Sequence, residues 1–146
     1  MENKNKKDYE KYAYKKVPKP TYMKNIIFAF LVGGGICTFG QLIINVLTSY
    51  GLSKESVASA TSIILIFIGA FLTGLGVYDQ IGKIGGAGAT IPITGFSNSI
   101  VSTAMEFKTE GFIFGVASKM FIIAGPVLVY GVGSSIIVGI LHLLIK

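Results

Sequence analysis

Few side chains in this 146-residue sequence are of the types that carry enzyme chemistry, and those few are scattered. There is one histidine, His142, one cysteine, Cys37, and seven acidic residues. They give neither the spacing of a metal site nor a nucleophile beside a base. The glycine-rich run 82–88 superficially resembles a nucleotide-binding loop, but no strand or βαβ unit surrounds it. We therefore expect no enzyme activity and no cofactor.

Residues 95–99 have the types and spacing to recognise an anion through backbone groups. A half-helix that begins near Gly95 has free N–H groups and the positive end of its dipole there. Inside a membrane, where the dielectric is low, such an end attracts a carboxylate. The alternative is that these small polar residues only cap a helix break and let helices pack. Lys83 and Lys119 could draw anions toward this end. The residues of the predicted solute path are Gly95, Phe96, Ser97, Asn98, Ser99, Lys83, Lys119, Gln41 and Asn45.

Polar side chains also occur inside the apolar stretches of the sequence. Gln41 and Asn45 are four residues apart, so they share one helix face. In lipid that face must turn toward protein or water, either as an interhelical hydrogen-bonded contact or as the lining of a pore. Lys119 either reaches the membrane interface with its amine or faces an aqueous path, where it meets an anion.

The elements that position these residues are apolar stretches long enough to cross a bilayer. The sequence is 51% hydrophobic and 14% charged, with a mean hydropathy of +0.67, whereas soluble domains have about 25% charged residues. A bilayer core about 30 Å thick needs about 20 apolar residues in a helix. Four runs of 22 residues or more contain no charge: 25–53, 56–78, 84–105 and 120–145. We predict an all-α polytopic membrane protein with four to five transmembrane or half-membrane helices, beginning with helices at 26–50 and 57–78.

The central run, 84–105, is free of charge but is not expected to form one regular helix. It contains the predicted helix breaks Gly86, Gly88 and Pro92, because glycine weakens a helix and proline removes a hydrogen-bond donor. Non-helical backbone at membrane depth is tolerated only where it is buried in protein or lines a water-filled cavity. We therefore predict a re-entrant or discontinuous central segment.

A further break is predicted in the last apolar segment. Residues 112–145 extend for about 51 Å as a helix, which is too long for one ordinary span. Gly125 and Pro126 are the expected position of the break, because proline also clashes with the preceding turn.

Residues 1–24 form a polar segment with eight lysines and three acidic residues. The positive-inside rule places this segment in the cytoplasm. The chain is therefore divided into a Lys-rich amino-terminal segment, 1–24, and a single transmembrane helical domain, 25–146. The segment either rests on anionic membrane lipid or docks a partner protein.

The complete absence of arginine argues against a nucleic-acid reader built on bidentate base contacts.

Several stretches of the chain together resemble one family of membrane proteins from spore-forming bacteria, the SpoVAC/SpoVAEb family. They are GAGATIPITGFSNSI at 86–100, MEFKTEGFIFG at 105–115, GGGICTFGQLI at 33–43 and the lysine-rich amino end that closes with KPTYMKN. The long charged amino-terminal stretch favours the SpoVAC side of the family over the SpoVAEb paralogue.

The resemblance implies a subunit of the SpoVA complex in the forespore membrane, which becomes the spore inner membrane. That complex moves dipicolinic acid, with Ca²⁺, into the developing spore and out again during germination. The implied partners are a SpoVAEb-like paralogue and a SpoVAD-like soluble protein, and the implied role is a channel subunit that works as an oligomer. Two alternatives remain: a structural subunit that docks these partners, and a tension-gated channel.

The solutes that the resemblance implies, dipicolinate and calcium, suggest roles for individual residues. Dipicolinate is a flat dianion, so Phe96 beside a helix end would suit its ring, and weak binding is preferable for a solute that must move on. If calcium travels as the chelate, its possible oxygen ligands at a mouth of the channel are Asp79, Glu106 and Glu110.

Overall fold

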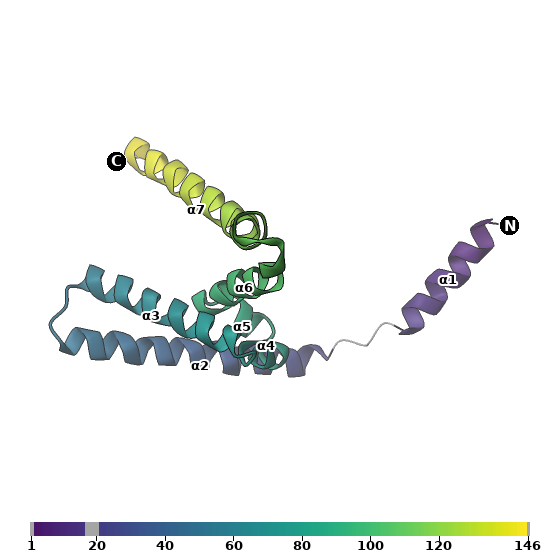
Figure 1. Ribbon diagram of the computed structural model, residues 1–146, viewed down its shortest axis with the longest axis horizontal. Helices are drawn as coiled ribbons and strands as arrows, with labels where there is room; N and C mark the ends of the chain where they lie inside the picture. The colour runs from purple at the N-terminus through teal and green to yellow at the C-terminus, as the bar shows by residue number, and fades with distance from the viewer. Residues whose placement is uncertain (1, 17–20, 146) are drawn as a thin grey trace.

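The computed structural model describes residues 2–16 and 21–145, and every regular element in this part of the chain is helical. This confirms the all-α prediction. Three segments are long and apolar enough to cross a membrane, namely Tyr22–Ser49, Lys54–Gly74 and Phe112–Ile145. In chain order (Figure 1) the elements are α1 (Glu2–Lys16), α2 (Tyr22–Ser49), α3 (Lys54–Gly74), α4 (Tyr78–Gly85), α5 (Ala87–Thr90), α6 (Ile93–Glu106), the 3-10 turn η1 (Lys108–Glu110), the π-helical turn η2 (Phe112–Ala117) and α7 (Ser118–Ile145).

Helices α2 and α3 form an antiparallel hairpin (Figure 1). The chain reverses at Gly51, where φ is +78°. Ser53 then caps α3, because its hydroxyl accepts a hydrogen bond from the Ser56 N–H at 3.3 Å. The predicted first span was 26–50 and the second 57–78, and the helices begin three or four residues earlier. The second helix ends at Gly74 rather than Tyr78, because Gly76 takes a positive φ of 71°.

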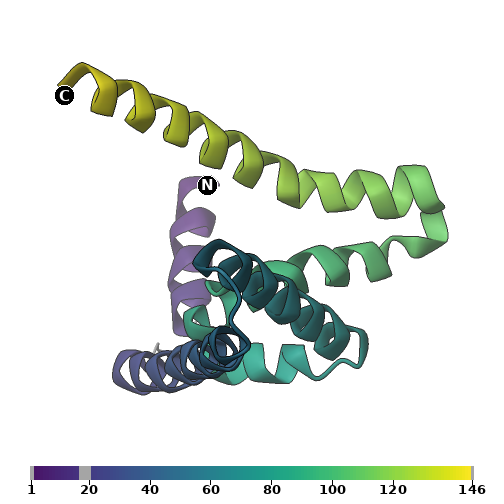
Figure 2. The same cartoon turned by 90° about the vertical axis from the view of Figure 1, so that its left-hand side faces the viewer.

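The central segment is interrupted at two of the three predicted breaks, Gly86 and Pro92, whereas Gly88 lies inside α5. α4 ends at Gly85, and Gly86 adopts a φ of +49° between α4 and α5. Pro92 then adopts an extended conformation and forms the N-cap of α6. α4 and α5 pack against α2, whereas α6 packs mainly against α3 (Figures 1 and 2). The two long helices therefore shelter the irregular backbone from one side.

Close backbone contacts explain why glycines occur where the central segment meets α2 and α3. A side-chain carbon at Gly88 would collide with the backbone carbonyl of Ala29 on α2. One at Gly69 on α3 would lie 2.8 Å from the carbonyl oxygen of Thr94 on α6. Small residues of this kind let membrane helices approach closely without a hydrophobic driving force.

The predicted break at Gly125 and Pro126 is wrong. α7 runs without interruption from Ser118 to Ile145, with Pro126 inside it. Proline removes only one hydrogen bond from the helix, and membrane helices accommodate that loss locally. The interruption lies earlier, at Gly111, where φ is +96° and the chain enters η2.

The chain turns back on itself between α4 and α7. In Figure 1, α4 lies at the end of the hairpin where α2 begins, and α7 starts toward that same end. From there α7 extends away from α2 and α3, and it has no buried residue within the described chain (Figures 1 and 2). Thus α4, α5 and α6 enter and return at one end of the hairpin.

Candidate functional site

A tyrosine holds the three short central helices together. Tyr78, at the start of α4, is only 3% exposed. Its hydroxyl donates to the backbone carbonyl of Ala89 on α5 at 2.8 Å and lies 2.7 Å from the hydroxyl of Thr94 on α6. Because the phenol has one proton, Thr94 can donate in the second of these bonds. The sequence places Tyr78 at the end of the predicted second span, 57–78, and gives no signal of this role.

The start of α6 lies two residues before the predicted one. α6 begins at Ile93, and the N–H groups of Gly95 and Phe96 both donate to the Pro92 carbonyl, at 2.8 and 3.2 Å. The free N–H groups at this helix end are those of Ile93 and Thr94, which find no acceptor among the described residues. Gly95 itself is buried, and a side-chain carbon there would collide with the carbonyl of Ala89.

The other predicted path residues on α6 form hydrogen bonds inside the chain. The Ser97 hydroxyl donates to the Ile66 carbonyl on α3 at 2.8 Å, and the Asn98 side-chain oxygen lies 2.8 Å from the Thr73 hydroxyl. Ser99 donates to the carbonyl of Phe96, one turn earlier on α6, at 2.9 Å. The first two bonds join α6 to α3, which is the arrangement expected if small polar residues let helices pack.

An apolar cavity of about 420 Å³ reaches the start of α6. This volume falls within the range of small-molecule sites, roughly 300–1,000 Å³. The only hydroxyl-bearing side chains in its wall are Tyr78 and Thr94. The remaining lining comes from α2, α3 and α4: Leu31, Val32, Gly35, Ile36, Phe39, Leu65, Ile68, Leu72 and Ile81.

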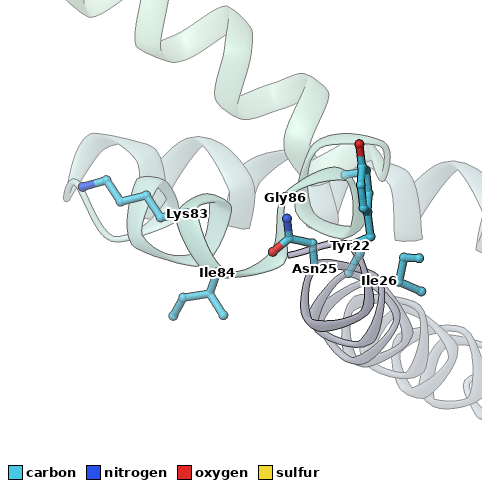
Figure 3. A pocket seen from close by; sticks show the side chains of 8 residues that line it. Tyr22, Asn25, Ile26, Lys83, Ile84 and Gly86 are labelled. Carbon is cyan, nitrogen blue, oxygen red and sulfur yellow. The ribbon is translucent and has the colours of Figure 1, made fainter. Parts of the chain in front are cut away.

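Lys83 lies beside a second cavity rather than beside residues 95–99. This cavity, of about 400 Å³, separates the start of α2 from the end of α4. Its lining residues are Tyr22, Asn25, Ile26, Ala29, Lys83, Ile84, Gly86 and Ala87. Figure 3 shows the amine of Lys83 pointing away from Asn25 and Tyr22, and it lies 3.5 Å from the Gln80 side-chain oxygen.

Lys119 lies at the other end of α6. Its amine sits 4.1 Å from the centre of the Phe107 ring, in a cation–π contact. Phe107 follows the last residue of α6, about 18 Å along the helix from Gly95. The structure therefore does not bring Lys83 and Lys119 together at the helix end.

The possible calcium ligands lie on three different elements. Asp79 is in the first turn of α4, Glu106 ends α6 and Glu110 ends η1. Within residues 2–16 and 21–145, no group of three or more histidine, cysteine or acidic side chains is arranged to hold a metal ion. Asp79, Glu106 and Glu110 therefore do not form such a group within the described residues, and calcium binding by these side chains stays a prediction.

Gln41 and Asn45 lie away from the central helices. The Gln41 side-chain nitrogen donates to the Asn45 side-chain oxygen at 2.9 Å, and both residues are exposed on α2. Gly40, directly before Gln41 in sequence, is buried and faces Leu65 on α3. The two carboxamides therefore occupy a separate surface of the protein.

Comparisons with known proteins agree with this architecture. The model of the SpoVAC/SpoVAEB sporulation membrane protein family matches residues 25–141. The stage V sporulation protein AC of Bacillus subtilis (strain 168) is 44% identical over 138 residues, which cover 94% of this chain and 92% of that protein. No solved structure matches the chain. On the family match and this identity, the chain belongs to the SpoVAC/SpoVAEB family of sporulation membrane proteins.

Proposed function

We propose that this protein is a channel subunit of the SpoVA complex that moves dipicolinic acid, together with Ca²⁺, across the spore inner membrane. Family membership supports a role in a sporulation membrane. The three apolar helices support a multi-pass protein. The lysine-rich amino terminus then lies in the cytoplasm by the positive-inside rule.

The observation that carries the proposal is the interrupted segment α4–α5–α6 packed against the α2–α3 hairpin. A membrane protein that only anchors or docks partners has no need of an interrupted segment packed against its long helices. Broken helices with free N–H groups are typical of proteins that pass polar solutes. The free amides of Ile93 and Thr94 provide such a helix end, and a carboxylate is the group that it favours.

The path itself is best placed between chains rather than within one. Ser97 and Asn98 already bond to α3, and the cavity at the start of α6 is largely apolar. A dianion needs more polar partners than this wall offers. The conduit therefore lies where this chain meets further subunits, of its own kind or of a SpoVAEb-like paralogue, with a SpoVAD-like protein bound on one face.

Flux measurements on purified protein test the proposal. Liposomes that hold dipicolinate are diluted into a terbium solution, and luminescence reports its release. Flux from this chain alone supports a complete channel, and flux only with the paralogue supports a shared one. Openings that appear only under suction in a patch favour the tension-gated alternative. No flux in any of these conditions, with the partners still bound, favours the docking subunit and removes the proposal.

A matched pair of serines refines the test. Ser99 on α6 and Ser134 on α7 each donate to the carbonyl three residues earlier, at 2.9 and 3.1 Å. Neither bond joins two helices, but Ser99 is half-buried and Ser134 is exposed, so the melting temperature of Ser99→Leu and of Ser134→Leu is measured beside the flux. If residues 95–99 border the path, Ser99→Leu reduces flux several-fold and Ser134→Leu does not. Equal flux in both variants moves the path away from α6.

A further inference from the structure

The outer face of α2 carries an uncovered polar stripe. It consists of Gly34, Thr38, Gln41, Asn45 and Thr48, which we call the outer seam, and all five residues are exposed. Their spacing alternates between four and three residues, so they line one side of the helix. The seam is about 21 Å long at 1.5 Å per residue, which is most of the thickness of a bilayer core.

The seam lies opposite the face that α2 uses inside the chain. Gly33 packs against Gly88 of α5, and Gly40 faces Leu65 of α3. At about 100° per residue, Gln41 and Asn45 are turned roughly 100–140° away from Gly40. No element described in the structure therefore covers the outer seam.

Polar groups on this seam are incompletely satisfied. The hydroxyls of Thr38 and Thr48 bond to carbonyls of their own helix, at 2.8 Å each. Gln41 and Asn45 bond to each other, but a carboxamide has two donors and an acceptor with two lone pairs. The Gln41 oxygen and the Asn45 amide protons remain available, within a 28-residue apolar helix. Lipid cannot satisfy them, so exposure of this face to hydrocarbon is costly.

A second copy of the same chain is the partner that this pattern fits best. Copies inserted in the same orientation run parallel, so that each Gln41 and Asn45 meets an identical carboxamide at the same depth. A carboxamide both donates and accepts, so the seam is complementary to itself. Gly34 and Thr38 are small enough for close approach, and the 3.5-residue repeat matches a left-handed helix pair. We propose that two copies of this protein associate in parallel through the outer seam of α2.

This inference concerns assembly and stands whichever solute the protein conducts. Disulfide cross-linking of the full chain in liposomes tests it without a transport assay. Cys37 is exposed and is first replaced by alanine. Thr38→Cys and Thr48→Cys then report on the seam, whereas Phe39→Cys and Val46→Cys report on the neighbouring face. Phe39 and Val46 are 46% and 54% exposed, so burial within the chain does not protect them. Dimers are expected at 38 and 48, with several-fold less at 39 and 46.

A second set of variants tests the role of the carboxamides. Gln41→Leu combined with Asn45→Leu, in the Thr38→Cys background, should lower the association constant about tenfold. Leu42→Ala, on the neighbouring exposed face, should leave it unchanged. Leucine favours insertion, so loss of dimers would not reflect loss of the membrane helix. Equal cross-linking at 38 and 39, no dimers at all, or dimers that survive the double replacement would each overturn the proposal.

Discussion

At the scale of single residues, Tyr78 contributes most to the order of the central segment. It is almost fully buried and bonds to two helices besides its own. We expect Tyr78→Phe to lower the free energy of unfolding by roughly 1–3 kcal/mol, because it leaves the Ala89 carbonyl and the Thr94 hydroxyl without their partner. Thermal unfolding in detergent, followed by circular dichroism, measures the loss.

The control for this variant is Tyr50→Phe. Tyr50 is 79% exposed at the end of α2, so the same loss of a hydroxyl should change the melting temperature little. If both variants melt alike, the Tyr78 hydroxyl does not hold α4, α5 and α6 together.

Gly88 gives a second prediction at this scale. Because its α-carbon faces the backbone of Ala29, Gly88→Ala must push α5 away from α2, at a cost of about 1–3 kcal/mol. Gly82→Ala is the matched control, since nothing lies within 4 Å of a side-chain carbon there and alanine favours a helix. The two melting temperatures should shift in opposite directions. Equal shifts would show that the α2–α5 contact is loose.

Residues whose effect is local were predictable from the sequence, and residues with distant partners were not. The breaks at Gly86 and Pro92 follow from backbone preferences. The bond of Ser97 to Ile66, 31 residues away, depends on how α6 packs on α3. The same holds for Tyr78, whose partners are 11 and 16 residues away.

At the scale of elements, α7 illustrates a limit of the same reasoning. Its length and Pro126 predicted a break, yet the helix continues through that residue. We expect Pro126→Ala to keep the helix and to preserve or raise the melting temperature, because it restores an N–H and removes a steric clash. Circular dichroism at 222 nm and a thermal melt measure both. A drop in helicity would mean that the proline is needed to shape two half-helices.

The packing of α6 on α3 explains why the two lysines do not meet at residues 95–99. The helix places Gly95 against α5 and Phe107 against Lys119, about 18 Å apart. Ser97 and Asn98, in its first two turns, form hydrogen bonds to α3. The positions of Lys83 and Lys119 in the sequence therefore did not predict where their amines lie relative to residues 95–99.

At the scale of the whole molecule, the lengths of the helices determine how the chain crosses the membrane. α2 has 28 residues and α3 has 21, about 42 and 32 Å at 1.5 Å per residue, so each is long enough to span a core of about 30 Å. α6 has only 14 residues, about 21 Å, and falls short. Since α4 and the start of α7 lie at the same end of the hairpin (Figure 1), we expect α4–α6 to enter and leave the membrane on one side.

This topology predicts which positions share a side of the membrane. Single cysteines are introduced into a Cys37→Ala chain at four exposed positions: Ser53, Asp79, Thr109 and His142. In sealed vesicles, a membrane-impermeant thiol reagent should label the cysteines at 79 and 109 from the side of the lysine-rich amino terminus. It should label those at 53 and 142 from the other side, because α2, α3 and α7 each cross once. If the cysteine at 109 is instead labelled together with the one at 53, the central segment crosses completely and the polar groups of α6 extend through the whole bilayer.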